Sequence, residues 1–445
     1  MTTLARTLGF RDLLLLVIGA VIGSGIFLVP GAILRQVDGS VGLAMLVWLV
    51  GGILSLMGGL TYGELSAMKP QAGGIYVYIR ECFGPIPAFL YGWTLFFVIA
   101  TGATATLSVA FSKYCGEIVA LSATGGKVVS LGMIAVIAVV NVLGARRSAD
   151  VQNVSTVVKA GAVVLISAAL LIYGRNYSAA TASLWPAKIT AALLSQAGMA
   201  MIGALWAYEA WQFATFSAGE AIDPQRNYPR AFFGGILFLI ALYIVANLAY
   251  IAALGPHDAA ETDTIAATAV SGVLSPALAK LVALAIMVST FSAANSIQLT
   301  APRVYYAMAR DGLFFRKLAE VHPRFRTPAF AVMVGALWSA VLALSGTFQK
   351  LFTYVIFSGW IFYGLAAACV FVYRKNEPEA ERPYKVPGYP WTPLLFVMAS
   401  AALVVNTIYS TFFAKNGTAS PLEAAVGIGV LVLGFPAYFI WRKRA

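Results

Sequence analysis

The chain has 445 residues, of which 60% are hydrophobic and only 11% are charged. That balance lies far outside the range of soluble globular domains and predicts an integral membrane protein. The formal net charge of +12 would suit a nucleic-acid partner. The Lys and Arg residues, however, flank apolar stretches instead of forming one basic surface, so no nucleic acid is expected. Composition therefore excludes a soluble enzyme and a nucleic-acid-binding protein.

Apolar stretches long enough to cross a bilayer, which takes about 20 residues, recur along the whole chain. We predict an all-α protein with twelve transmembrane helices, near residues 10–36, 40–67, 84–113, 127–144, 151–173, 192–217, 231–254, 276–302, 328–346, 351–373, 393–413 and 421–441. Most Lys and Arg fall in loops on the side of the N-terminus. The positive-inside rule then places both termini in the cytoplasm and makes the lipid bilayer the first expected partner of a multi-pass protein.

Residues 19–27, GAVIGSGIF, put three glycines and a serine inside the first apolar stretch. A break in the helix here would leave the backbone N–H groups of Gly23, Ser24 and Gly25 at the tip of the following half-helix, where they suit an anion. A break at mid-membrane survives only where protein, water or a polar ligand satisfies the freed groups. The alternative is an unbroken helix in which Gly19 and Gly23 form a GxxxG packing face.

The sixth apolar stretch is irregular in a corresponding way. Residues 198–220, GMAMIGALWAYEAWQFATFSAGE, hold Glu209 in the middle of an apolar segment that is crowded with aromatic residues. The first ten spans divide into two sets of five, residues 10–173 and 192–373, and each set begins with an interrupted span. Residues 393–441 add two regular spans. Matching interruptions in two halves are typical of inverted-repeat transporters, whose site lies between the broken helices.

Five motifs, in chain order, resemble those of the amino acid–polyamine–organocation (APC) transporters. They are GAVIGSGIF (19–27), PQAGGIYVYIRECFG (70–84), WAYEAWQFATFSAGEAIDPQRNYPRA (206–231), RVYYAMARDG (303–312) and RPYKVPGYP (382–390). The third motif looks most like that of the L-type amino acid transporters, as a prokaryotic stand-alone member. The resemblance implies a LeuT-like fold with a five-plus-five inverted repeat, which moves amino acids by alternating access across the cell inner membrane.

The eukaryotic L-type branch is joined to a single-span heavy chain through an external cysteine. The loop after the third span of this chain offers only Cys115, at its edge. No heavy-chain partner is therefore expected.

An α-amino acid offers one carboxylate and one ammonium, and a membrane site has to satisfy both. The N–H groups of the first break, with the Ser24 hydroxyl, would take the carboxylate, and carbonyls freed in both breaks would take the ammonium. The resemblance implies the same positions. The predicted substrate site consists of Val21, Gly23, Ser24, Gly25, Trp206, Ala207 and Glu209. Helix packing without a ligand is the alternative.

Lys159 is placed near the middle of the fifth span, about nine residues beyond Asp150. A lysine there costs about 3 kcal/mol even on the lenient insertion scale, so it should be packed inside the bundle. The resemblance implies that it occupies the place of the cation in sodium-coupled relatives, and that no sodium site exists. Ser292 and Ser296, one turn apart in the eighth span, would face it. The alternative is a structural charge without a part in transport.

Two further residues of the sixth span carry specific expectations. The resemblance makes Trp206 a gate that closes over the substrate, whereas Tyr208 and Trp211 are expected to be packing. Glu209 is either paired with a cation, such as a dibasic substrate, or protonated and cycling a proton. Lys159 as its partner is the third option.

The rival class is a membrane-embedded enzyme. Only two histidines occur, both in predicted loops, and no catalytic motif lies in a span, so we expect no enzyme, no cofactor and no metal. The predicted function is sodium-independent exchange of neutral L-amino acids, with tolerance of cationic ones. Proton-coupled symport and cationic amino acid or polyamine antiport remain the alternatives.

Overall fold

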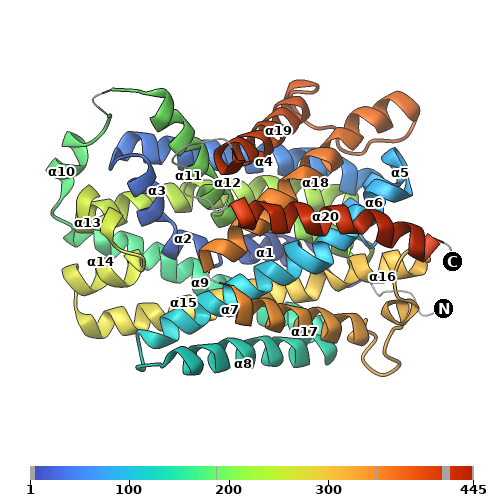
Figure 1. Cartoon of the computed structure of the whole chain (residues 1–445), viewed down its shortest axis with the longest axis horizontal. Coiled ribbons are helices and arrows are strands. Elements are labelled where there is room, and N and C mark those ends of the chain that lie inside the picture. The colour runs from blue at the N-terminus through green and yellow to red at the C-terminus, as the bar shows by residue number, and fades with distance from the viewer. Residues whose placement is uncertain (1–5, 187, 347, 413–420, 443–445) are drawn as a thin grey trace.

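The computed structural model describes residues 6–186, 188–346, 348–412 and 421–442, and over these it is helical, with one isolated bridge between Leu8 and Ala221. Most of the long helices run along the long axis of a single bundle (Figure 1). The first half holds α1 (Phe10–Val21), α2 (Gly25–Leu28), α3 (Pro30–Gln36), α4 (Val41–Met68), α5 (Ile75–Phe83), α6 (Pro85–Thr94), the π-helical turn η1 (Leu95–Ile99), α7 (Ala100–Gly116), α8 (Ala123–Val142), α9 (Ala145–Tyr173) and α10 (Tyr177–Ala182). The second half holds α11 (Ala191–Ala207), the 3₁₀ segment η2 (Trp211–Glu220), α12 (Pro224–Leu254), α13 (Pro256–Glu261), α14 (Ile265–Val273), α15 (Pro276–Thr300), α16 (Pro302–Arg310), the 3₁₀ turn η3 (Arg316–Ala319), α17 (Ala329–Ser345), α18 (Phe348–Asn376), α19 (Trp391–Phe412) and α20 (Pro421–Arg442).

Ten helices of the described residues are long and apolar enough to cross a membrane. They match ten of the twelve predicted spans. The other two predicted spans, the ninth and the twelfth, are present as shorter apolar helices over Ala329–Ser345 and Gly429–Trp441. The chain is thus an all-helical membrane protein, in which backbone polar groups are satisfied within each helix because the hydrocarbon offers no partner.

Four of the membrane helices begin with a side-chain cap at the bundle end opposite to the N-terminus. A hydroxyl at the N-cap accepts a hydrogen bond from the backbone N–H three residues on, at distances of 3.0 to 3.4 Å, for α4, α8, α11 and α15. Each such cap satisfies one of the four N–H groups that a helix leaves unpaired and is worth about 1 kcal/mol. The N-cap residues are Ser40, Ser122, Thr190 and Ser275.

The second motif, residues 70–84 after α4, contains one short helix, α5, next to η2. The Gly73 N–H donates to the Phe216 carbonyl at 3.1 Å. A Cβ at Gly74 would lie 2.4 Å from Thr215 Oγ1, so only glycine allows this approach. The end of η2 is therefore held between α5 and the N-terminal segment.

The two irregular spans lie at the centre of the bundle. Helix α1 contacts α9, α12 and α15, and it also touches η2. Helix α11 packs on α4 and contacts α2 and α3. The long helices therefore surround the places where the first and sixth spans depart from α-helix.

Candidate functional site

The first span breaks where the glycines predict it. Helix α1 ends at Val21, α2 begins at Gly25, and Ile22, Gly23 and Ser24 between them are buried and non-helical. Among the described residues, the N–H groups of Gly23, Ser24 and Gly25 donate to no protein acceptor. Unpaired buried N–H groups are rare in proteins, so a polar ligand or water has to meet them.

The GxxxG alternative, an unbroken first span, is therefore wrong. Gly19 does serve close packing, but against α9: a Cβ at Gly19 would lie 2.0 Å from Thr156 Oγ1. Close approach and helix interruption thus occur in the same nine-residue stretch.

The sixth span breaks as well. Helix α11 ends at Ala207, and Ala210 has a left-handed backbone with φ +86° before η2 begins at Trp211. A non-glycine residue in this region is uncommon and costs about 1 kcal/mol or more. The strained turn places Glu209 at the centre of the bundle.

The two breaks touch each other. A Cβ at Gly25 would lie 2.4 Å from the Ala207 Cα, so glycine is required for this approach. The Trp206 indole Nε1 donates to Ser24 Oγ at 3.3 Å. Residues almost two hundred positions apart in sequence therefore form one contiguous set, as an amino acid site between two broken helices requires.

The carbonyls of the breaks already have partners. The Tyr243 hydroxyl donates to the Val21 carbonyl at 3.2 Å, and the Glu209 N–H donates to the Trp206 carbonyl at 3.1 Å. The Ser289 hydroxyl donates to the carbonyls of Ile22 and Gly23, at 3.0 and 3.3 Å. Each carbonyl oxygen has a second lone pair, so a substrate ammonium could donate to these carbonyls together with their present donors.

Lys159 is 1% exposed and holds α9 to the first break. Its Nζ donates to the Gly19 carbonyl at 2.5 Å and to the Ser289 carbonyl at 3.4 Å. The lysine is thus packed against backbone carbonyls of α1 and α15, as its cost in the membrane demands.

The serine partners predicted for Lys159 are corrected. Ser292 Oγ donates to Gln152 Oε1 at 3.1 Å, and Ser296 Oγ has no hydrogen-bond partner among the described residues. Gln152 lies two helical turns before Lys159 on α9, so Ser292 contacts α9 about two turns away from the lysine. Ser289, one turn earlier on α15, occupies the predicted place.

Glu209 is buried and accepts two hydrogen bonds. The donors are Gln212 Nε2 and the Tyr363 hydroxyl, both at 2.6 Å. Among the described residues, no Lys or Arg lies within 4.0 Å of this carboxylate, so the third option, pairing with Lys159, is not realised in this conformation. The Tyr363 contact brings α18 into the site, which no sequence motif indicated.

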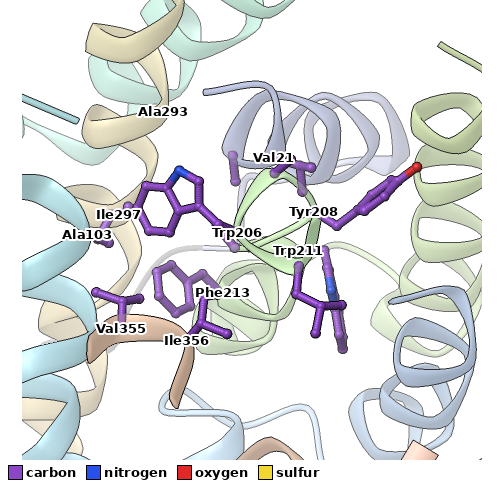
Figure 2. Packing of buried hydrophobic residues seen from close by; sticks show 14 of the residues in the cluster. Val21, Ala103, Trp206, Tyr208, Trp211, Phe213, Ala293, Ile297, Val355 and Ile356 are labelled. Atoms are coloured by element: carbon purple, nitrogen blue, oxygen red, sulfur yellow. The ribbon is translucent and has the colours of Figure 1, made fainter. Parts of the chain in front are cut away.

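The aromatic residues of the sixth span point in two directions (Figure 2). The Trp206 ring extends toward Ile297 and Ala103, beside Phe213, whereas Tyr208 and Trp211 lie on the opposite side of the view. Tyr208 packs on Trp48 and Tyr243, and Trp211 packs on the rings of Tyr62, Phe232 and Phe396. The expectation that Tyr208 and Trp211 are packing residues agrees with these contacts.

A buried ion pair lies at the end of η2 that is nearer the N-terminus. Arg303 Nε donates to Glu220 Oε1 at 2.9 Å, and Arg303 also donates to the Leu299 carbonyl. The N–H groups of Thr7 and Leu8 donate to the Glu220 carbonyl at 2.9 and 3.0 Å. The end of η2, the N-terminal segment and the end of α15 are therefore fastened together, a link that sequence reasoning missed.

Paired helix breaks at the centre of a bundle of apolar helices are typical of membrane transporters. The model of the amino acid permease family matches residues 8–434. The chain is 31% identical over 452 positions to the serine/threonine exchanger SteT of Bacillus subtilis (strain 168), covering 99% of this chain and 98% of that protein. It is 31% identical over 415 positions to the b(0,+)-type amino acid transporter 1 of Mus musculus (92% and 84% covered), and 28% identical over 454 positions to the large neutral amino acids transporter small subunit 2 of Mus musculus (99% and 82%).

The chain belongs to the amino acid permease family, within the APC superfamily. It is a multi-pass membrane protein of amino acid transport. The family and these relatives are transporters and not enzymes.

Proposed function

We propose that this protein is a sodium-independent exchanger of neutral amino acids that also accepts cationic ones. It works by alternating access in a twelve-span LeuT-like fold, with residues 10–173 and 192–373 as inverted repeats, residues 393–441 as two added spans, and both termini in the cytoplasm. The single observation that carries the proposal is the contact of Gly25 with Ala207, which joins the unpaired N–H groups of one break to the carbonyls of the other.

In the proposed site, the N–H groups of Gly23, Ser24 and Gly25 bind the substrate carboxylate, because three convergent donors at a helix start suit an anion. The ammonium group shares the carbonyls of Val21 and Trp206 with their present donors. Ala207 fixes the distance between the two breaks. The Trp206 indole donates to the Ser24 hydroxyl at 3.3 Å, and its ring serves as the gate.

Lys159 supports sodium independence in this proposal. Its ammonium holds the carbonyls of Gly19 and Ser289, groups that a bound cation would otherwise coordinate. Ser292 and Ser296 then affect the same transport step as Lys159. They act through Gln152 and α15, without contacting Lys159.

The first experiment measures which substrate groups are required. We expect exchange in proteoliposomes with radiolabelled alanine, serine, leucine or arginine inside and outside, and no uptake into liposomes that lack internal substrate. Amino acid amides and putrescine should compete at least 10-fold more weakly than the free amino acids, because the N–H groups of the first break would stay unpaired. Equal competition by an amide would refute the carboxylate assignment.

A second function, proton-coupled symport, is favoured by one observation. Glu209 is a buried carboxylate whose described partners are a tyrosine and a glutamine, not a cation. Such a group exists either protonated or facing a cationic substrate. An inward proton gradient that drives uptake into liposomes without internal substrate would establish symport in place of exchange. Competition by putrescine would indicate cationic amino acid or polyamine antiport.

We also propose that the chain works without a heavy chain. One relative is named as a small subunit, and that name is a statement about the relative alone. Here Cys115 is half-buried near the end of α7 and has no disulfide partner among the described residues. Native mass spectrometry of the purified chain, active alone in proteoliposomes, tests this.

A further inference from the structure

A groove lies at the N-terminal end of the bundle, away from the two breaks. It has a volume of about 680 Å³ and is formed by α4, the start of α12 and the segment 383–387. Its lining differs from the two breaks, since it combines exposed arginines with apolar side chains at the start of the membrane helix α12. No step of the proposed transport uses it.

The charged part of the groove is positive. Arg226 and Arg230 lie one turn apart on α12, so their side chains share a face. Both side chains are exposed, and among the described residues neither guanidinium group has an ion-pair or hydrogen-bond partner. Asp223 is the one acidic residue of the lining and lies more than 4.0 Å from both guanidinium groups. Two free guanidinium groups against one carboxylate favour an anion.

The remaining lining continues into the membrane. Leu60, Pro229 and Phe233 form the apolar part of the groove, and Phe233 is 50% exposed. Leu237, one turn further along α12, is 47% exposed and extends this apolar face. Arginines at the level of the interface with apolar side chains below them match the headgroup and the acyl chain of one lipid.

We propose that this groove binds one anionic glycerophospholipid from the leaflet on the N-terminal side. The phosphate lies between Arg226 and Arg230, and an acyl chain lies along Phe233 and Leu237. A free phosphate ion would leave the apolar part of the groove unused. The lipid connects the start of α12 to the segment before α19. Three residues separate the start of α12 from the end of the broken sixth span.

The test uses the full chain purified in detergent and native mass spectrometry with phosphatidylglycerol, phosphatidylcholine or inorganic phosphate as the probe. We expect phosphatidylglycerol to bind more tightly than phosphatidylcholine. The double variant R226Q/R230Q should lose about 30-fold in phosphatidylglycerol affinity, from about 1 kcal/mol for each arginine near a membrane surface. The variant R226K/R230K keeps the charge and should retain most of the affinity.

The matched control is Arg316→Gln, which removes an exposed arginine from the same end of the bundle outside the groove. It should bind phosphatidylglycerol as the wild type does. Equal binding of phosphatidylglycerol by R226Q/R230Q and the wild type would overturn the proposal. Displacement of the lipid by millimolar inorganic phosphate would also overturn it, because the site would then recognise only an anion. Unchanged elution of all variants in size-exclusion chromatography shows that they are folded.

Discussion

Replacing Lys159 with alanine tests the link between α9 and the first break. The side chain donates to the carbonyls of Gly19 and Ser289, at 2.5 and 3.4 Å. A hydrogen bond from a charged donor contributes about 1.5–3 kcal/mol, and the longer contact lies at the weak end of that range. We therefore expect the assembled site to lose about 3 kcal/mol, which corresponds to a roughly 100-fold lower exchange rate at about 1.4 kcal/mol per factor of ten.

The assay is exchange of radiolabelled amino acid in proteoliposomes, with and without sodium. Lys159→Ala should elute as folded protein yet exchange about 100-fold more slowly, and the wild type should be indifferent to sodium. Lys113→Ala is the matched control, because it removes an exposed lysine from the last turn of the membrane helix α7. Normal turnover of Lys159→Ala, or full sodium dependence of the wild type, would refute the reasoning and leave Lys159 a structural charge.

Three further predictions concern the breaks and the closure beside them. Gly25→Ala should nearly abolish exchange and cost roughly 1–3 kcal/mol of stability, because the new Cβ meets the Ala207 backbone at 2.4 Å, and a thermal-shift series against the wild type checks it. Glu209→Gln should change the competition by arginine and lysine relative to alanine and leucine across pH 5 to 8; identical profiles in both proteins would leave Glu209 without a role. Glu220→Gln should weaken the buried pair with Arg303 and speed the labelling, by a thiol reagent applied from the N-terminal side, of a cysteine introduced into the site in place of Ser296. Unchanged labelling would show that this pair does not restrict access to the site.

Much of the membrane fold follows from one-dimensional patterns. Apolar length predicts the spans because a bilayer of fixed thickness needs about 20 residues per helix. Gly23, Ser24 and Gly25 predict the first break, since an interruption at mid-membrane needs residues with little side chain and a polar function. The structure contains both this break and the one before Trp211.

The partners across the site depend on tertiary structure. Ser289, and not Ser292 or Ser296, shares the first break with Lys159, because the rotation and height of α15 against α9 decide which turn faces inward. Spacing within one helix states which residues share a face, but it carries no information on how two helices are set against each other.

Glu209 illustrates the same division. The sequence by itself determined that a carboxylate lies inside an apolar span, where its cost predicts a functional role. Only the folded chain decided that Tyr363, 154 residues away on α18, and Gln212 donate to it. Gln212 shares the third motif with Glu209, but Tyr363 belongs to none of the five motifs, since a hydrogen bond between distant segments exists only after the helices have packed.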